Sequence, residues 1–131
     1  MGGDTLMAGI VIAGFGFRAS AVLDSLTSAL EKAADGLAVT GFAAPADKIN
    51  HPALTALARR CDLPLYAVDI KMMAATVTAT RSAIVLEKRQ TGSVAEAAAL
   101  GLFSGPAELI CTRQISADRR AVCALAIGES L

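Results

Sequence analysis

The chain has 131 residues, equal numbers of basic and acidic side chains, and a hydrophobic fraction of 54% with only 4% aromatic residues. This length fits one domain with a core of its own. The zero net charge argues against general nucleic-acid binding, and no apolar run reaches the about 20 residues that a membrane span needs. We therefore expect neither a nucleic acid nor a membrane as partner.

The first part of the chain predicts two strands with a helix between them. Residues 7–13 are a short apolar run with β-branched side chains, which is typical of a buried strand. Apolar residues recur at helical spacing over residues 19–34, and Gly36 stands where a helix would end. Residues 37–44 are a second strand candidate, which Pro45 closes.

The middle part of the chain predicts one helix and one clear strand. His51-Pro52 opens the helix, because proline suits its first turn, and apolar residues follow on one stripe. Residues 64–68 predict a third strand. Beyond it we expect one helical turn over residues 70–75, an irregular segment over 76–82, and a brief strand over 83–86.

The last part predicts a helix and a hairpin. An alanine-rich helix covers residues 94–103, and strands over 109–112 and 121–127 are joined by the charged turn 116–120. The alternation of strands and helices predicts an α/β fold: a compact three-layer α/β/α domain with a mixed, mainly parallel sheet. The whole chain, residues 1–131, is expected to be this single domain.

The start of the alanine-rich helix carries a capping pattern. In Thr91-Gly92-Ser93, the serine stands three residues before Glu96, so each side chain can bond the backbone N–H of the other. The remaining N–H groups and the helix dipole favour an anion, such as a carboxylate or phosphate, before Gly92. For Glu96 we favour the capping role over general acid chemistry.

A glycine motif follows the first strand. Gly14-Phe15-Gly16-Phe17-Arg18-Ala19 fits G-x-G-x-x-A and stands between a strand and a helix, as a dinucleotide fingerprint does. However, Ala43-Ala44-Pro45 ends the second strand, where that fingerprint needs an acidic residue. The alternatives are a glycine turn that allows close packing and a substrate loop in which the Arg18 guanidinium binds a carboxylate.

Further polar residues could line the same crevice. Lys48 follows the second strand, and loops after parallel strands meet at one edge of a sheet. Thr80 and Arg81 could contact a polyanion, although hydroxyls in loops more often bond the local backbone. No Ser-His-Asp order or nucleophile elbow is present, so the catalytic group is unknown, with Glu96 and Lys48 as the candidates.

The cysteines and the histidine suggest no special chemistry. Cys61, Cys111 and Cys123 are scattered, which indicates buried thiols in a reducing cytoplasm. His51 is interpreted as a helix flank, and no metal site and no cofactor are expected. Residues 1–6 are expected to be a disordered leader without the features of a signal peptide.

Several segments of the chain occur in a characteristic order. They are Gly14-Phe15-Gly16-Phe17-Arg18, Ala44-Pro45-Ala46-Asp47-Lys48 followed by Pro52-Ala53-Leu54, Leu63-Pro64-Leu65, and Thr91-Gly92-Ser93-Val94-Ala95-Glu96-Ala97-Ala98-Ala99-Leu100. This ordered set resembles the CobE family, which is similar to the C-terminal domain of CbiG in cobalamin biosynthesis. The resemblance covers residues 7–127, and it implies a compact three-layer α/β domain with a mixed sheet.

The resemblance implies pathway membership more firmly than a reaction. Full-length CbiG proteins carry further N-terminal domains, open the ring-expanded lactone of a cobalt-precorrin and release acetaldehyde. The chain looks like the stand-alone CobE form, associated with the aerobic route. A corrinoid intermediate is an apolar macrocycle with many acetate and propionate carboxylates, which the cations and the helix start would bind while Phe15 and Phe17 offer apolar surface.

The leading hypothesis is a cobalamin-pathway protein that binds a precorrin-type tetrapyrrole intermediate, as a carrier or as an accessory to other enzymes of the pathway. A hydrolase of the CbiG type and a dinucleotide-binding module are the alternatives. An alanine-rich surface could also support a homo-oligomer. The predicted substrate-binding residues are Gly14, Phe15, Gly16, Phe17, Arg18, Lys48, Thr80, Arg81, Thr91, Gly92, Ser93 and Glu96.

Overall fold

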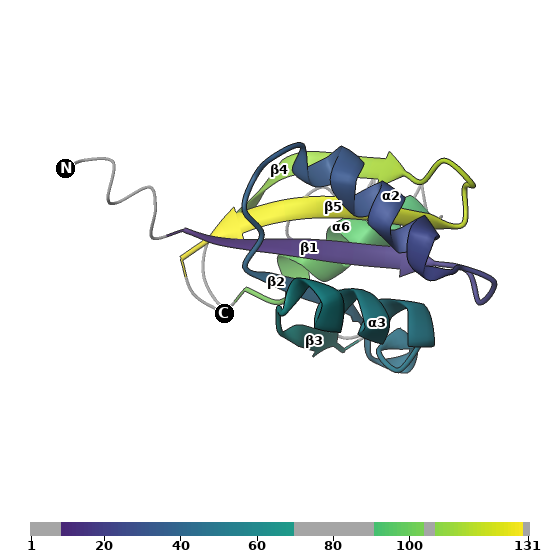
Figure 1. Ribbon diagram of the computed structural model, residues 1–131. Helices are drawn as coiled ribbons and strands as arrows, with labels where there is room; N and C mark the ends of the chain where they lie inside the picture. Colours follow the sequence, from purple (N-terminus) through teal and green to yellow (C-terminus); the bar gives the residue numbers. More distant parts are fainter. Residues whose placement is uncertain (1–8, 70–90, 104–106, 130–131) are drawn as a thin grey trace.

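Five strands form one mixed sheet in the computed structural model (Figure 1), which describes residues 9–69, 91–103 and 107–129, with backbone alone for 91–93 and 112–113. Their spatial order is β3-β2-β1-β5-β4. The strands are β1 (Ile10–Phe17), β2 (Gly41–Pro45), β3 (Leu65–Val68), β4 (Ala107–Ile115) and β5 (Ala121–Gly128). The predictions for residues 70–86 lie outside the described residues.

The strand directions agree with the expected mixed sheet. β1 pairs in parallel with β2, and β2 with β3, whereas β5 is antiparallel to both β1 and β4. Among the described strands, β5 alone therefore runs against the others. The hairpin of β4 and β5 was predicted, and so was the parallel set. The prediction of a mixed, mainly parallel sheet is confirmed.

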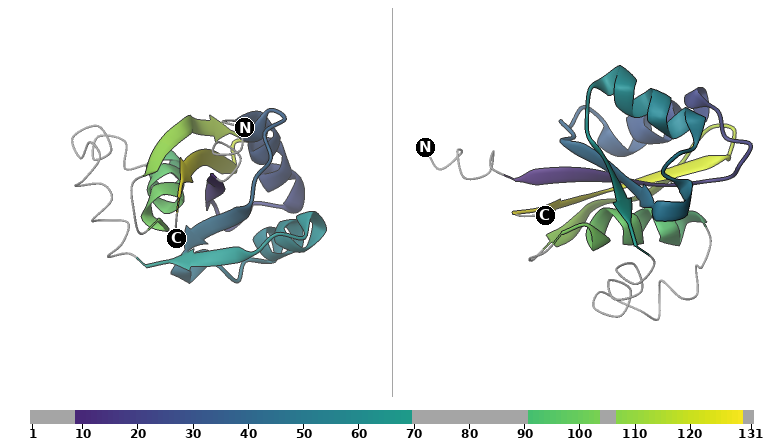
Figure 2. Two further views of the ribbon diagram at one scale, coloured as in Figure 1. Left: turned by 90° about the vertical axis from the view of Figure 1, so that its left-hand side faces the viewer. Right: turned by 90° about the horizontal axis from the view of Figure 1, so that it is seen from below.

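Helices cover both faces of the sheet. The helices α2 (Leu23–Ala34) and α3 (Pro52–Cys61) lie on one face, and α6 (Thr91–Gly101) lies on the other, as the right-hand view of Figure 2 shows. A short 3-10 helix, η1 (Ala46–Lys48), follows β2. The three predicted layers are thus present. Within the described parts, no helix combines the length and apolar character needed to cross a membrane.

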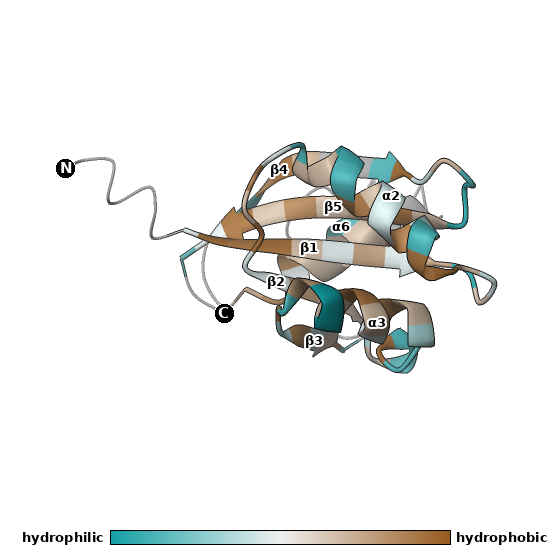
Figure 3. Ribbon diagram, in the orientation of Figure 1, coloured by the Kyte–Doolittle hydropathy of each residue, from teal (hydrophilic) through white to brown (hydrophobic). Residues whose placement is uncertain are grey.

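The central strand β1 is buried on both faces, which explains its unbroken apolar sequence. Side chains alternate along a strand, and Phe15 and Phe17 pack on the side of α2 and α3, whereas Ile12 packs against α6. Figure 3 shows apolar residues along the central strands and hydrophilic residues on the outer helix surfaces and in the β4–β5 turn. The core therefore lies in two layers, one on each side of the sheet.

Gly14 lets α6 approach the sheet closely. A Cβ added to Gly14 would lie 2.5 Å from the Ala99 backbone nitrogen and closer still to the carbonyl oxygen of Ala95. Ala95, Ala98 and Ala99 are all fully buried. The alanine-rich sequence of α6 is thus a packing surface whose small side chains fit against the small residues of the sheet.

Several predicted boundaries were wrong. β1 extends to Phe17 rather than ending at residue 13, because β5 pairs with it as far as Phe17↔Ala121. β2 begins only at Gly41, and α2 begins at Leu23, so residues 37–40 and 19–22 are connections. Cys61 is exposed rather than buried, because it ends α3 just before Asp62 turns the chain in the left-handed conformation. Cys123 is buried and Cys111 partly buried.

Candidate functional site

The connections at the carboxyl ends of β1 and β2 meet the β4–β5 turn at one end of the sheet. β1 and β2 run in parallel, and β5 begins opposite Phe17, the last residue of β1. α6 runs opposite to β1, since Gly14 contacts Ala95 and Ala99 while Ile12 packs near Leu102. The start of α6 therefore points toward the same end of the sheet, which is the right-hand end in Figure 1.

Four cations lie at this end, and we call them the basic edge: Arg18, Lys48, Arg119 and Arg120. The backbone N–H of Arg18 donates to the carbonyl of Arg120 at 2.9 Å, which continues the β1–β5 ladder by one residue. Arg18, Arg119 and Arg120 are all exposed. Sequence reasoning had placed the last two only in a charged turn, because their distance from Arg18 along the chain hides the contact.

Lys48 joins the basic edge through Phe17. Its Nζ donates to the carbonyl oxygen of Phe17 at 3.4 Å and stands 5.8 Å from the centroid of the Phe17 ring. The hydrogen bond is long, and the contact with the ring is electrostatic. The ammonium group is therefore held beside the residue that precedes Arg18, although Lys48 and Arg18 follow different strands.

His51 fixes the connection that carries Arg18. Its Nδ1 accepts a hydrogen bond from the N–H of Ala53 at 3.1 Å, so His51 is the N-cap of α3, in line with its interpretation as a helix flank. Since Nδ1 accepts, the neutral ring carries its proton on Nε2. That group donates to the carbonyl of Ala19 at 2.9 Å, and the ring packs edge-on against Phe17.

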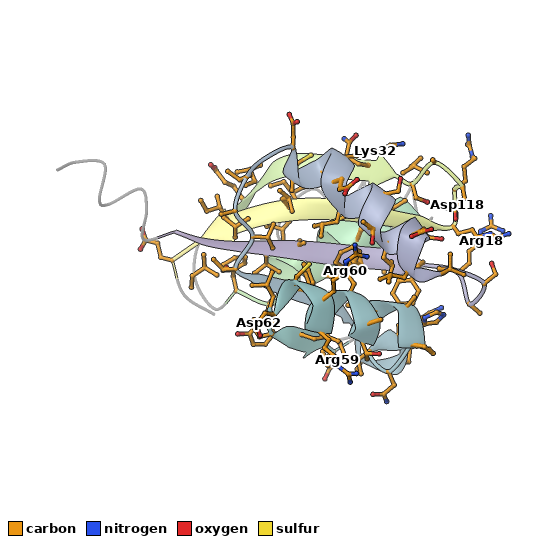
Figure 4. The ribbon with its side chains drawn as sticks, viewed as in Figure 1. Arg18, Lys32, Arg59, Arg60, Asp62 and Asp118 are labelled. Atoms are coloured by element: carbon orange, nitrogen blue, oxygen red, sulfur yellow. The ribbon has the colours of Figure 1, made fainter. Side chains whose placement is uncertain are left out.

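Asp118 ties the β4–β5 turn to α2 (Figure 4). Its Oδ2 accepts from the hydroxyl of Ser25 at 2.5 Å, and its Oδ1 accepts from the hydroxyl of Ser116 at 2.6 Å. Both serines are buried. The bonds from Ser116 and then Ser25 hold the pKa of Asp118 at about 2, because they stabilise its charged form.

The glycine motif lies in a strand and not in a loop, so its residues are placed differently from the prediction. Gly14, Phe15, Gly16 and Phe17 all lie in β1, and all are buried. Phe15 packs its ring edge-on against Phe42 in the core, so neither it nor Phe17 offers a surface to a macrocycle. The motif also lacks the glycine turn at a helix start that a dinucleotide needs, because five residues separate Phe17 from α2.

The predicted cap of α6 is displaced. The helix begins at Thr91, so Gly92 and Ser93 lie in its first turn and Ser93 is not the N-cap. Gly92 is therefore part of the helix, which the sequence pattern alone did not reveal. Glu96 is partly buried on α6, whereas Lys48 ends η1, which follows β2.

The remaining candidates are two residues of the segment after β3 and one hollow beside α3. Thr80 and Arg81 lie outside the described residues. A shallow hollow at the end of α3 is lined by Ala58, Arg59, Asp62, Leu63 and Pro64, far from the basic edge. In the described segments, no three His, Cys, Asp or Glu side chains are grouped as metal ligands would be.

Comparisons with known proteins agree with this fold. The family model described as Cobalamin synthesis G C-terminus matches residues 11–126. The chain is similar to the crystal structure of CobE, a protein from the cobalamin biosynthetic pathway, with 27% identity, coverage of 94% of this chain and 93% of that chain, and a TM-score of 0.74.

It is also similar to the crystal structure of the cobalamin biosynthesis protein chiG from Agrobacterium tumefaciens. The identity is 29%, the coverage is 89% of this chain and 97% of that chain, and the TM-score is 0.70. A search of curated proteins finds no match. Because the family model spans nearly all of its residues, the chain belongs to the Cobalamin synthesis G C-terminus family.

Proposed function

We propose that this chain acts in cobalamin biosynthesis by binding a precorrin-type tetrapyrrole intermediate at the basic edge, as a carrier or accessory factor. The observation that carries the proposal is the pairing of Arg18 with Arg120, through the 2.9 Å bond from Arg18 N–H to the Arg120 carbonyl, with Arg119 next to Arg120 in the same turn. Membership in a cobalamin-synthesis family supports the choice of ligand. The intermediates of that pathway are polycarboxylates, so they match a group of four cations, of which the three arginines are exposed.

The basic edge offers two kinds of donor to carboxylates. The guanidinium groups of Arg18, Arg119 and Arg120 can form paired hydrogen bonds with a carboxylate. The Lys48 ammonium is held only by a 3.4 Å bond and a contact with an aromatic ring, so a carboxylate can replace the carbonyl at little cost. The several acetates and propionates of one ligand could thus be engaged from more than one connection.

Charge alone is too weak for tight binding, so apolar contact must contribute. Exposed ion pairs contribute about 0.2–1 kcal/mol each, and four of them give at most about 4 kcal/mol, whereas micromolar binding needs about 8 kcal/mol. Apolar surface lies next to Arg18. The Ala21 N–H donates to the Arg18 carbonyl at 3.0 Å, and this turn presents Val22, which is 49% exposed. The edge of a macrocycle could cover Val22 while its carboxylates reach the cations.

The proposal is tested by titrating the protein with hydrogenobyrinic acid, a corrinoid polycarboxylate, and following the visible spectrum. We expect saturable binding that weakens as salt is added, because exposed charges are screened. Arg18→Gln should raise the dissociation constant about two- to fivefold, the effect of one exposed ion pair. Arg59→Gln removes a cation at the end of α3 beside the hollow and is the matched control; it should bind as the wild type does. Absence of any spectral change at tens of micromolar protein would overturn the proposal.

The hydrolase alternative asks more of these residues. It needs Glu96 or Lys48 to activate water, and the Lys48 ammonium is held against the Phe17 carbonyl and ring. A binding role needs no group that activates water. Acetaldehyde released from a cobalt-precorrin lactone in the presence of the purified chain would establish the hydrolase instead.

A further inference from the structure

The β4–β5 turn holds an arginine in a conformation that favours glycine. Ser116 N–H donates to the Ala121 carbonyl at 2.8 Å, and Arg119 N–H donates to the Ser116 carbonyl at 2.9 Å, which closes a tight turn. Within this turn Arg119 has a φ of +62°. A side chain is disfavoured there by contact with its own backbone, and glycine is the usual residue. An arginine at this position is kept at a cost to stability, which suggests a use for its side chain.

Two buried hydroxyls and one carboxylate hold the turn in this shape. We call Asp118, Ser25 and Ser116 the clasp. Ser25 belongs to α2, where its hydroxyl also accepts from the Val22 N–H at 3.1 Å. The Ser116 hydroxyl accepts from the N–H groups of Arg120 at 3.2 Å and Ala121 at 3.1 Å. Each hydroxyl therefore donates to Asp118 and accepts from the backbone, so the clasp is fully bonded.

The clasp links the β4–β5 turn to α2, which lies far from it in the sequence. Asp118 contacts α2 through Ser25 and the turn through Ser116, and its Oδ1 also accepts from the Arg120 N–H at 3.1 Å. The Arg120 carbonyl in turn accepts from Arg18. A carboxylate that bonds two hydroxyls and a backbone N–H is held firmly in its charged form. The β1–β5 ladder thus places Arg120 beside Arg18, and Asp118 holds the shape of the turn that carries Arg119 and Arg120.

We propose that Asp118 is a positioning residue that orders Arg119 and Arg120 beside Arg18, and that Arg119 is a ligand-binding residue of the basic edge. This proposal rests on the proposed function. The recognised chemistry is a polycarboxylate, and the contribution of Arg119 comes from being held in place before the ligand arrives. The backbone of Arg119 is ordered before the ligand arrives, so binding loses less entropy than it would with a mobile turn, and we expect an effect at the upper end of the range for an exposed ion pair.

The test compares two variants with opposite effects on stability. Arg119→Gly removes the guanidinium and relieves the left-handed backbone, so it should fold at least as stably as the wild type. Its dissociation constant for hydrogenobyrinic acid should nevertheless rise about fivefold. Asp118→Asn keeps the size of the side chain but has only one acceptor oxygen for the two hydroxyls, so it should loosen the clasp and raise the dissociation constant by a similar factor.

Coupling between the two residues separates positioning from general damage. If Asp118 acts through Arg119, then Arg119→Gly should weaken binding less than twofold when Asp118→Asn is already present. Gly36→Ala is the control for lost stability, because Gly36 has a φ of +88° just beyond the other end of α2. It should lower the melting temperature and leave the dissociation constant unchanged. Circular dichroism shows that each variant is folded during the titration, and Ser25→Ala opens the clasp from α2 if Asp118→Asn does not fold.

The outcomes distinguish this inference from the proposed function. The inference is supported if Arg119→Gly binds more weakly at undiminished stability and if the same change adds little to the effect of Asp118→Asn. Binding by the wild type that neither variant changes overturns it and leaves the proposed function standing. If the wild type itself binds no hydrogenobyrinic acid, the proposed function is overturned and the assignment of Arg119 with it.

Discussion

Gly14→Ala should destabilise the protein strongly, although the change adds only one methyl group. The added Cβ would stand 2.5 Å from the Ala99 backbone nitrogen and 2.9 Å from its Cα, so the backbone of α6 itself would have to move. Elsewhere in a strand, alanine is favoured over glycine by about 0.5–1 kcal/mol. Overpacking costs about 1–3 kcal/mol, and contact with a helix backbone places Gly14→Ala at the upper end.

We therefore expect a loss of about 2–3 kcal/mol, which for a chain of this size lowers the melting temperature by roughly 10 °C. Urea and thermal unfolding followed by circular dichroism measure both quantities. Gly41→Ala is the matched control, because its Cβ would meet the ends of the Tyr66 and Ile12 side chains at 3.0 and 3.3 Å. Those side chains can shift, so its loss should stay near 1 kcal/mol or below. A Gly14→Ala protein as stable as the wild type would refute the packing argument.

Three further results are expected. Because the pKa of Asp118 falls from 3.8 to about 2 in the folded state, the stability that Asp118 provides is complete above about pH 5 and is lost as the pH falls toward 2. Urea unfolding at several pH values should show that the difference in stability between wild type and Asp118→Asn shrinks over that range. A constant difference would contradict the assignment. His51→Ala should cost about 1 kcal/mol through the lost N-cap of α3, with His51→Asn costing less, as denaturant midpoints would reveal. Phe15→Ala should cost about 3–5 kcal/mol, since Phe15 is fully buried against Phe42; a fall of less than 1 kcal/mol in urea unfolding would show that Phe15 is not a core residue.

The sequence predicted the architecture well because its signals are local. Helical spacing in α2, Pro52 after His51 in α3, and the charged turn before β5 each specify an element from a few neighbouring residues. The apolar runs of the central strands also indicate burial on both faces, which requires helices on each side of the sheet. Three layers follow from these facts without knowledge of the contacts.

The site was predicted less well because it depends on how far β1 pairs with β5. Gly14-Phe15-Gly16-Phe17 has the residue pattern of a loop, yet pairing with β5 extends β1 through it. That extension buries both aromatic rings and moves the first exposed residue to Arg18. No pattern within the motif could show this, because the partner strand lies about a hundred residues later in the chain.

By itself the sequence determined the order and type of the described strands and α-helices, the burial of the central strands and the family resemblance. The tertiary structure decided that Gly14 serves the approach of α6 and that Arg18 pairs with Arg120 of the β4–β5 turn. The physical reason is that periodicity and capping act over a few residues, whereas strand ends and neighbouring connections are set by ladders between distant segments. The basic edge is a product of those ladders.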